Sequence, residues 1–197
     1  MGHSKADKQK SHERIVKTAA TVFRERGVDG IGVADLMKAA GLTHGGFYGH
    51  FSSRDELIAE AIDCALQDGG KSMAAVIKDI RSPNTALGTL IDAYLSLAHR
   101  DHVGTSCAVA TMANDVARSG KRTRAAYTRQ VGVYLELLAR LIGTDKRKSR
   151  RTKAMAALST LVGAVSMARA VNDEKLSREL LKAAAEALKA QLNVLKK

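Results

Sequence analysis

The stretch GLTHGGFYGHFSSRDELI, residues 41–58, carries the most structural information in this sequence. Its first half predicts a short helix over residues 44–50, which Thr43 is placed to cap at the N-terminal end. Gly41 is typical of a residue that ends a preceding helix, because glycine tolerates a left-handed backbone. The letters SSRDEL then supply an N-cap serine and an acidic first turn, so we expect a longer helix to begin at Arg54.

Two more helices are predicted immediately upstream. Residues 8–26 carry apolar side chains at helical spacing, and Gly27 follows their basic last turn. Residues 33–40 form a shorter amphipathic segment after the turn VDGIG. Three short helices, with a glycine-containing turn between the second and the third, are typical of a helix-turn-helix unit. In such a unit the third helix enters the major groove of DNA, while the second crosses the DNA backbone.

The predicted third helix contains three glycines, Gly45, Gly46 and Gly49. Glycine inside a helix is unfavourable by roughly 0.5–1 kcal/mol relative to alanine. We expect close approach of this backbone to DNA, or to a neighbouring helix, to offset that cost. The same segment offers four side chains that could hydrogen-bond to a partner, namely Thr43, His44, Tyr48 and His50.

The remainder of the chain is predicted to be helical throughout. Alanine and leucine are strong helix formers, and the whole chain contains a single proline. Further helices are expected over residues 54–77, 85–99, 106–118, 122–141, 146–171 and 174–195, with a bend or break at Gly69–Gly70. The sequence therefore predicts an all-α fold of about nine helices, with a helix-turn-helix DNA-binding domain over residues 1–53 and a helical-bundle domain over residues 54–197.

Overall charge and cysteine content narrow the function classes. A formal charge of +12 favours polyanionic partners, with nucleic acid ahead of an anionic membrane surface or acidic small molecules. Cys64 and Cys107 lie far apart without CxxC spacing, which argues against a disulfide scaffold or a thiolate zinc site. The N-terminus lacks a secretory h-region, and no stretch approaches the length of a membrane span. We therefore expect a soluble cytoplasmic protein without a metal or cofactor.

Residues 41–58 closely resemble the signature of the TetR (tetracycline-repressor-like) regulators, in which a small residue, a tyrosine, a His-Phe pair and a basic residue follow in that order. The two upstream helices fit the same DNA-binding domain, and the resemblance covers roughly residues 10–65. Beyond it, TSCAVATMANDVARSGKRTRAAYT is similar to a segment of one broad subgroup but indicates no particular ligand. The sequence departs from the commonest pattern where Gly46 and Gly49 replace larger residues, and where Arg54 replaces a lysine.

The resemblance implies a role for each matching residue. The residues it assigns to DNA are Thr43 as helix cap and phosphate contact, His44, Gly45 and Gly46 facing the bases, Tyr48 and His50 at the DNA backbone or bases, and Arg54 at a phosphate. Phe47 and Phe51 are assigned to the core. The implied function is a sequence-specific DNA-binding transcriptional regulator, a repressor that a small-molecule ligand releases from a palindromic operator.

The resemblance also implies a homodimer and an effector pocket in the larger domain. A palindromic site with two half-sites requires a twofold dimer, whose interface we expect on the last two helices. The predicted interface residues are Leu158, Leu161, Val165, Leu180, Leu181 and Leu188. Methionine and tyrosine suit adaptable apolar recognition with an occasional polar handle. The predicted pocket residues are Leu66, Met73, Tyr94, Cys107, Thr111, Met112, Tyr127, Tyr134 and Met167.

Three other interpretations are open at this point. Cys107 follows a loop at an expected helix start, where the helix dipole lowers a thiol pKa, so it could sense oxidants or electrophiles; a buried core cysteine is the simpler interpretation. A sequence-tolerant architectural DNA-binding protein also fits the charge.

An enzyme is not expected, because no HExxH, P-loop, GxSxG or dinucleotide fingerprint occurs, and His99, Asp101, His102 and Cys107 match no strong metal template. The sequence does not distinguish repression from activation.

Overall fold

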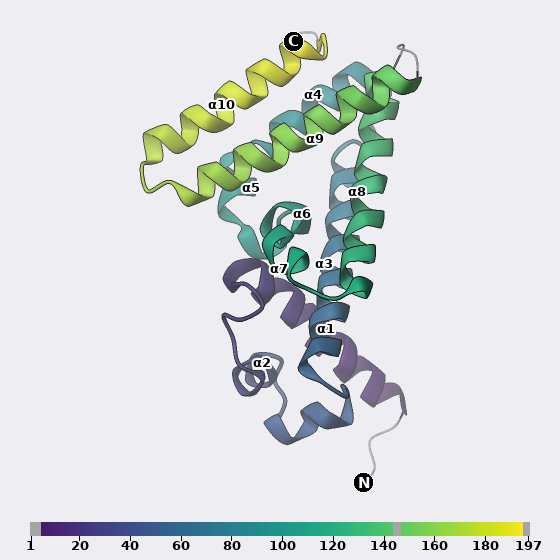
Figure 1. The fold of residues 1–197 in the computed structure, drawn as a ribbon, viewed down its shortest axis with the longest axis vertical. Coiled ribbons are helices and arrows are strands. Elements are labelled where there is room, and N and C mark those ends of the chain that lie inside the picture. Colours follow the sequence, from purple (N-terminus) through teal and green to yellow (C-terminus); the bar gives the residue numbers. More distant parts are fainter. Residues whose placement is uncertain (1–4, 144–146, 195–197) are drawn as a thin grey trace.

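A computed structural model describes residues 5–143 and 147–194, and Figure 1 shows its fold. The regular structure among these residues is helical, which confirms the predicted all-α fold. The α-helices are α1 (Lys5–Arg26), α2 (Val33–Ala39), α3 (Arg54–Val76), α4 (Pro83–Tyr94), α5 (Leu97–Asp101), α6 (Ala108–Thr111), α7 (Ala113–Ala117), α8 (Lys121–Ile142), α9 (Arg147–Ala170) and α10 (Glu174–Gln191). Two 3-10 segments complete the order, η1 (His44–Gly49) and η2 (Val103–Thr105). Within the described ranges, no helix is both long and apolar enough to cross a lipid bilayer.

The head of the molecule, at the bottom of Figure 1, consists of α1, α2 and η1 packed around buried aromatic rings. Phe47 and Phe51 stack with their ring centroids 5.5 Å apart, and both are almost fully buried. Phe23 of α1 and Met37 of α2 are buried in the same core. This small apolar centre holds the three segments in a helix-turn-helix arrangement.

Two glycines end the helices of the head where the sequence predicts them to end. Gly27 has φ of 74° after α1, and Gly41 has φ of 70° after α2. The Gly27 N–H donates to the Phe23 carbonyl oxygen at 3.0 Å, which satisfies an acceptor at the helix end. Glycine adopts this left-handed backbone without the steric cost of a Cβ atom, so both turns are tight.

The body is built on two long helices, α3 and α8, which run side by side away from the head in Figure 1. At the far end, α9 and α10 pack together as an antiparallel pair, and α4 packs against α8 and α10. A Cβ atom at Gly69 of α3 would lie only 2.8 Å from the hydroxyl oxygen of Tyr134 in α8. Gly69 thus allows α3 to approach α8, and α3 continues unbroken through the predicted break at Gly69–Gly70.

The helix predicted over residues 85–99 is divided in the structure. It begins earlier, at Pro83. The backbone N–H of the first helical residue has no partner inside the helix, so proline, which has no N–H, is well suited to that position. It ends at Tyr94, and a new short helix, α5, starts after Ser96. The Ser96 hydroxyl accepts the N–H of His99 at 3.1 Å, so this serine caps α5 instead of continuing α4.

The helix predicted over residues 106–118 is also divided, into α6 and α7 at Met112. Met112 is fully buried, and its backbone (φ −115°, ψ 8°) ends α6. No local sequence signal marks this break. The predicted helix over residues 44–50 is a 3-10 segment, a geometry that occurs in short runs such as this one. The predicted helix ends at residues 146 and 195 lie outside the described residues.

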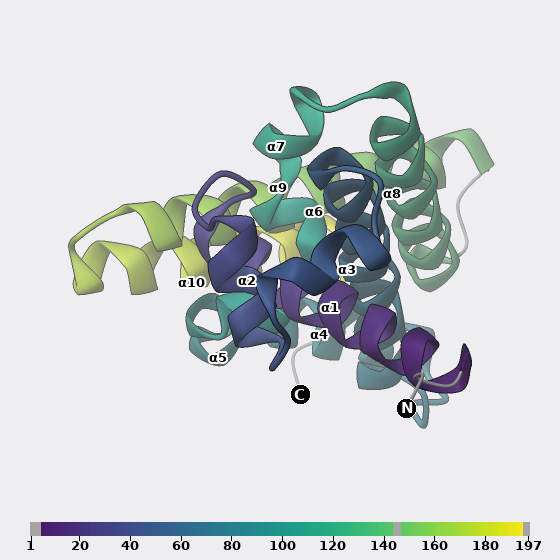
Figure 2. The same ribbon diagram turned by 90° about the horizontal axis from the view of Figure 1, so that it is seen from below.

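The head is fastened to the body mainly through α1. Figure 2, seen from below, shows α1 crossing α3, with α2 beside them. α1 packs along α3 and against η2, whereas α2 packs on α1 and η1. A shift of the body therefore reaches η1 mainly through α1 and the start of α3.

Candidate DNA-reading surface and internal cavity

The outer side of η1 forms an exposed polar surface. Tyr48 is 76% exposed, and its ring stands edge-on against buried Phe47 with 5.3 Å between the centroids. Thr43, His44 and Gly45 are exposed beside it. The segment thus buries one aromatic residue and presents its polar groups outward, as a recognition helix requires.

The glycines of η1 leave open space outside the chain. A Cβ atom at Gly45 or Gly49 would meet no heavy atom of the described chain within 4 Å. A Cβ atom at Gly46 would make ordinary contacts, 3.7 Å from Met37 Cε and 3.8 Å from Thr43 Oγ1. The fold itself therefore does not need glycine at these positions, and their small size leaves room for something outside the chain.

Thr43 occupies the predicted N-cap position without capping η1. Its backbone is extended, at φ −81° and ψ 148°, but its side chain makes no cap hydrogen bond. The N–H of Gly46, a usual donor to an N-cap side chain, already donates to the Thr43 carbonyl oxygen at 3.1 Å. The predicted capping role is therefore wrong, and the Thr43 side chain lies exposed on the η1 surface.

His50 turns partly inward, toward α1. Its ring centroid lies 6.0 Å from that of His12, which also contacts Glu60 at 2.8 Å between Nε2 and Oε2. Burial lowers the pKa of His50, and the nearby His12 and Lys8 lower it further. His50 Nδ1 is buried without a hydrogen-bond partner in the described chain. The assigned DNA contact of His50 stays a prediction, and its visible contacts join η1 to α1.

Arg54 holds the loop between α1 and α2. Its guanidinium donates to the carbonyl oxygens of Val28 and of Ile31, the latter at 3.5 Å. It also forms an ion pair with exposed Asp29 at 3.3 Å. Sequence reasoning missed this anchoring role, because it depends on how the loop folds back over the start of α3. The predicted phosphate contact would share a guanidinium that these groups already occupy.

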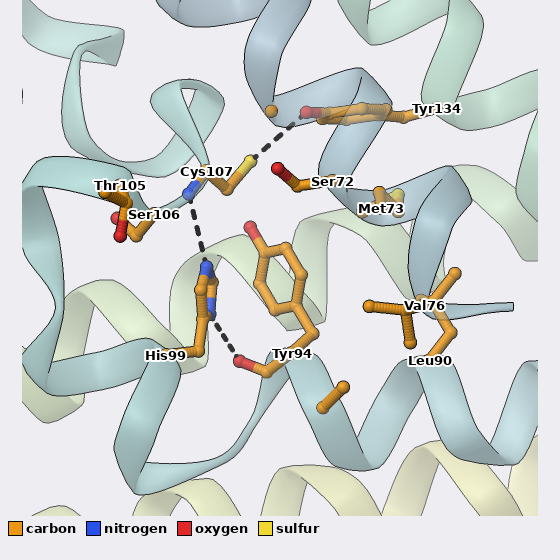
Figure 3. Close-up of a pocket in the computed structure, with 12 residues that line it drawn as sticks. Ser72, Met73, Val76, Leu90, Tyr94, His99, Thr105, Ser106, Cys107 and Tyr134 are labelled. Carbon is orange, nitrogen blue, oxygen red and sulfur yellow. Dashed lines mark hydrogen bonds between the residues drawn. The ribbon is translucent and has the colours of Figure 1, made fainter.

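A cavity of about 100 Å³ lies in the body between α3, α4, α8 and the segment around η2 (Figure 3). Four of the predicted pocket residues line it, namely Met73, Tyr94, Cys107 and Tyr134. The lining residues that sequence reasoning did not include are Gly69, Ser72, Val76, Leu90, Ala93, His99, Thr105 and Ser106. The cavity therefore depends on segments that are far apart in the sequence.

The other five predicted pocket residues lie elsewhere. Leu66 and Met112 are buried in the core away from the cavity lining, and Thr111 is partly buried. The Tyr127 hydroxyl donates to the Val109 carbonyl oxygen at 2.9 Å. Met167 is 52% exposed on α9. For these residues the pocket prediction is corrected, because helical periodicity does not show which buried face borders a cavity.

Two hydrogen bonds fix the protonation of His99 in the cavity wall. Its Nδ1 lies 2.6 Å from the Tyr94 carbonyl oxygen, which can only accept, so Nδ1 carries the hydrogen. The backbone N–H of Cys107 donates to Nε2 at 3.2 Å, so Nε2 carries none. Burial lowers the pKa of His99 as well. His99 is therefore a neutral imidazole with both nitrogens engaged.

Two tyrosine hydroxyls lie near the Cys107 thiol. The Cys107 thiol donates to the Tyr134 hydroxyl oxygen at 3.8 Å. The Tyr94 hydroxyl points toward the same space, as Figure 3 shows, but has no hydrogen-bond partner among the described residues. Burial, with the neighbouring thiol, raises the pKa of Tyr94 well above its ordinary value. Both rings thus present neutral hydroxyl groups.

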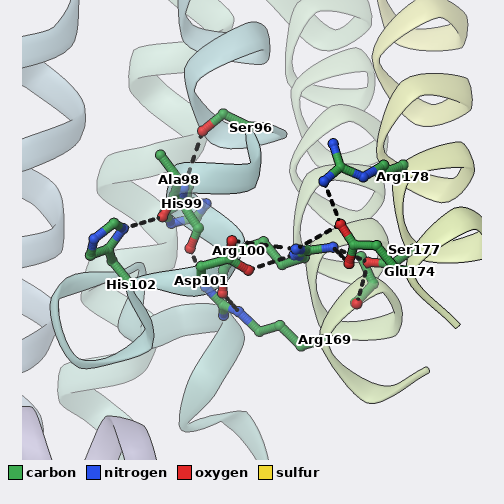
Figure 4. Close-up of polar contacts among 11 residues, drawn as sticks. Ser96, Ala98, His99, Arg100, Asp101, His102, Arg169, Glu174, Ser177 and Arg178 are labelled. Carbon is green, nitrogen blue, oxygen red and sulfur yellow. Dashed lines mark hydrogen bonds and ion pairs between the residues drawn. The ribbon is translucent and has the colours of Figure 1, made fainter. Parts of the chain in front are cut away.

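The cavity wall is tied to the far end of the body by arginines (Figure 4). Arg169 of α9 donates to the carbonyl oxygens of His99 at 2.6 Å and of Arg100 at 2.9 Å. Arg100 in turn pairs with Glu174 of α10 at 2.8 Å. The short helix α5, which carries His99, is therefore held against α9 and α10.

A buried arginine ties the cavity wall to the head. Arg24 of α1 donates to the Gly104 carbonyl oxygen at 2.6 Å and to the Ala65 carbonyl oxygen at 2.9 Å. Gly104 belongs to η2 and directly precedes the lining residues Thr105 and Ser106. A Cβ atom at Gly104 would overlap a carboxylate oxygen of α1, so η2 and α1 are in close contact.

The predicted dimer-interface residues face the interior of the chain. Leu158, Leu161, Val165, Leu181 and Leu188 are buried in the chain's own core, and Leu180 is partly buried. Assigning the five buried residues to an exposed interface was therefore wrong, because they already pack against neighbouring helices. Among the residues that α9 and α10 expose, alongside charged side chains such as Lys182 and Glu186 of α10, is a set of small and apolar residues. We call this set the outer α9–α10 face: Met155, Ala156, Ser159, Met167, Leu176, Ala183 and Ala187.

Comparisons with known proteins agree on one family. Residues 15–61 match the family described as bacterial regulatory proteins, tetR family. The chain is 30% identical over 173 residues to Rv0196, an uncharacterized HTH-type transcriptional regulator of Mycobacterium tuberculosis, which covers 84% of this chain and 87% of that protein.

Solved structures share the fold. A TetR transcriptional regulator from Chloroflexus aurantiacus superposes with a TM-score of 0.80 at 23% identity, over 95% of this chain and 96% of that one. A TetR-family regulator from Cytophaga hutchinsonii also gives 0.80, at 18% identity, over 100% of both chains. The chain therefore belongs to the TetR family of bacterial transcriptional regulators.

Proposed function

We propose that this protein is a sequence-specific DNA-binding repressor whose η1 surface reads the DNA. The observation that carries the proposal is the open space at Gly45 and Gly49 beside exposed Tyr48. A backbone without side chains can approach DNA closely, and exposed hydroxyl and imidazole groups can bond to phosphates or base edges. The formal charge of +12 adds a sequence-independent attraction that salt screens.

The repressor acts as a dimer through the outer α9–α10 face. Residues 154–168 of α9 contain no charged side chain, although Met155 and Met167 are exposed. A surface helix normally turns charged residues toward solvent, so a face without them favours cover by another surface. A twofold copy is the simplest cover, and it places two η1 surfaces for a palindromic operator.

A small molecule in the cavity releases the operator by shifting the population of dimer conformations. Two connections support this coupling. Helix α3 runs from Arg54 in the head to Gly69 and Met73 at the cavity. The second connection is Arg24, which bonds α1 to the Gly104 carbonyl oxygen beside the cavity wall. A ligand that displaces this wall acts on α1 as well as on α3.

Sensing through Cys107 is less well supported than ligand binding. Neither nitrogen of His99 is free to accept the thiol proton, since one donates to Tyr94 and the other accepts from the Cys107 backbone N–H. His102 is exposed and bonds to the Ala98 carbonyl oxygen instead. Helix α6 has only four residues, so its dipole is weak. We predict that Cys107→Ser leaves the operator affinity unchanged under oxidants and quinones.

The proposed function is tested by selecting bound sequences from a random DNA pool at moderate salt. A palindromic site with two related half-sites is expected for a dimeric regulator. A reporter that carries this site then distinguishes repression from activation. Tight binding at low salt without any enriched sequence would contradict the proposal and favour an architectural DNA-binding protein.

A further inference from the structure

The cavity in the body is lined without formal charge. None of the described lining residues is Asp, Glu, Lys or Arg, and the one histidine, His99, is held neutral by its two hydrogen bonds. The nearby Arg169 points its guanidinium at the carbonyl oxygens of His99 and Arg100. A charged ligand would lose its hydration here without a charged side chain in the lining to pair with, which is unfavourable.

One polar group in this wall lacks a partner. The Tyr94 hydroxyl oxygen is buried, the residue is only 6% exposed, and the hydroxyl makes no hydrogen bond of normal geometry to a described residue, although the weakly polar Cys107 thiol lies beside it. The second tyrosine hydroxyl, of Tyr134, already accepts from the Cys107 thiol. A buried hydroxyl without a hydrogen bond is unfavourable, so Tyr94 marks the point where a ligand oxygen fits.

The volume of the cavity limits the size of its occupant. The enclosed space is about 100 Å³, smaller than a dry apolar cavity of about 150 Å³ that admits benzene in another protein, so a single ring is the upper limit and would extend into the opening beside α3. Met73, Leu90 and Tyr94 supply apolar walls. Ser72 and Val76 are exposed and also line the cavity, so a ligand can enter beside α3.

We propose that the effector is a small uncharged molecule, about the size of a single ring, whose one polar oxygen hydrogen-bonds to the Tyr94 hydroxyl. Phenol has these properties and serves as the probe. This proposal rests on the proposed function in one respect, because it takes the cavity to be the site where the effector binds. Binding can be measured without DNA.

Isothermal titration of the full-length protein compares phenol with toluene, benzoate and 2-naphthol. Phenol is expected to bind, benzoate at least about tenfold more weakly because of its charge, and 2-naphthol more weakly than phenol because of its size. If benzoate binds as tightly as phenol, the proposal that the effector is uncharged is wrong. If 2-naphthol binds more tightly than phenol, the proposed limit of a single ring is wrong. Failure of phenol and toluene to bind at all would overturn the proposal.

Tyrosine variants test the hydrogen bond. Tyr94→Phe is expected to weaken phenol binding about tenfold while leaving toluene binding unchanged. Tyr127→Phe is the matched control, because the Tyr127 hydroxyl bonds to the Val109 carbonyl oxygen outside the cavity lining. An unchanged ratio of phenol to toluene affinity in Tyr94→Phe would overturn the role of Tyr94.

Alkylation of the wild-type protein gives a second measurement that needs no variant. Saturating phenol is expected to slow the reaction of iodoacetamide with Cys107, which lines the cavity, but not with Cys64, which does not. Equal rates with and without phenol at Cys107 would contradict occupancy of this cavity. If the protein binds a selected operator but not phenol, the proposed function stands and this inference is wrong. If phenol binds in a way that depends on Tyr94 but no specific DNA sequence is bound, the cavity is a ligand site and the proposed function as a sequence-specific repressor is wrong.

Discussion

At Gly45 and Gly49 in the head, a Cβ atom would meet no described heavy atom within 4 Å, whereas at Gly69 in the body it would lie 2.8 Å from the hydroxyl oxygen of Tyr134. The same residue type therefore serves two purposes. In η1 the missing side chain leaves room for a partner outside the chain. In α3 it leaves room for the neighbouring helix. Substitutions at these glycines should consequently separate the loss of DNA binding from the loss of stability.

The largest effect is expected from Gly45→Glu in η1. A carboxylate on this surface would face DNA phosphates and occupy the space that the backbone needs, so operator affinity should fall about 100-fold. The thermal unfolding temperature should change little, because a side chain at this position meets no described atom. Fluorescence anisotropy with the selected operator and differential scanning calorimetry measure the two quantities. An unchanged operator affinity would remove η1 from the DNA-reading role.

Gly69→Val in α3 is expected to have a smaller effect, on stability instead of on operator affinity. The new side chain would push against the buried Tyr134 ring, and overpacking of a core typically reduces the free energy of unfolding by about 1–3 kcal/mol. The measurement is urea unfolding followed by circular dichroism. Operator affinity of the folded fraction is measured separately, because Gly69 lines the cavity that we propose is coupled to η1 through α3.

Gly132→Ala in α8 is the matched control for Gly69→Val. Gly132 also lies inside a long helix, but a Cβ atom there would contact no heavy atom of the described residues within 4 Å. Helix propensity alone should then raise the free energy of unfolding by roughly 0.5–1 kcal/mol. If both variants change stability in the same direction and by the same amount, the close contact with Tyr134 is not the cause.

The head could be predicted closely from the sequence because its signals are local. Gly27 and Gly41 end their helices through their own backbone conformations, and Phe47 is buried by its place in a short segment. The inward contacts of Arg54 were missed, since they depend on the path of a loop more than 20 residues away in the chain.

The cavity could be predicted only in part because it is a product of tertiary packing. Tyr94 and Tyr134 were identified by residue type, but His99 reaches the cavity only because Ser96 starts a new helix. The interface prediction failed for a related reason. Helix α9 is apolar on its inner and outer sides, and periodicity alone cannot show that Leu161 faces the core while Met167 faces outward.

The smallest effect concerns two histidines, one in each region. Burial lowers the pKa of His50 in the head, with further lowering by His12 and Lys8. Burial also lowers the pKa of His99 in the body, where Arg169 acts in the same direction and the hydrogen bond to the Tyr94 carbonyl oxygen acts against it. In both cases the unfolded chain binds protons more readily than the folded one below an ordinary histidine pKa of about 6.5. Stability is therefore complete above that pH and declines as the pH falls through the lowered values.

We expect the free energy of unfolding to fall between pH 7 and pH 5, measured by urea unfolding at several pH values. His99 should contribute more than His50, because a proton on His99 Nε2 would also oppose the N–H that Cys107 donates to it. His99→Gln should accordingly flatten this dependence, while His102→Gln, at an exposed position, should leave it unchanged. Asp101 and Glu174 have lowered pKa values because they bond to Arg100, so their protonation begins below this window. A His99→Gln variant with the wild-type slope would therefore show that the neutral imidazole is not what couples the cavity wall to pH.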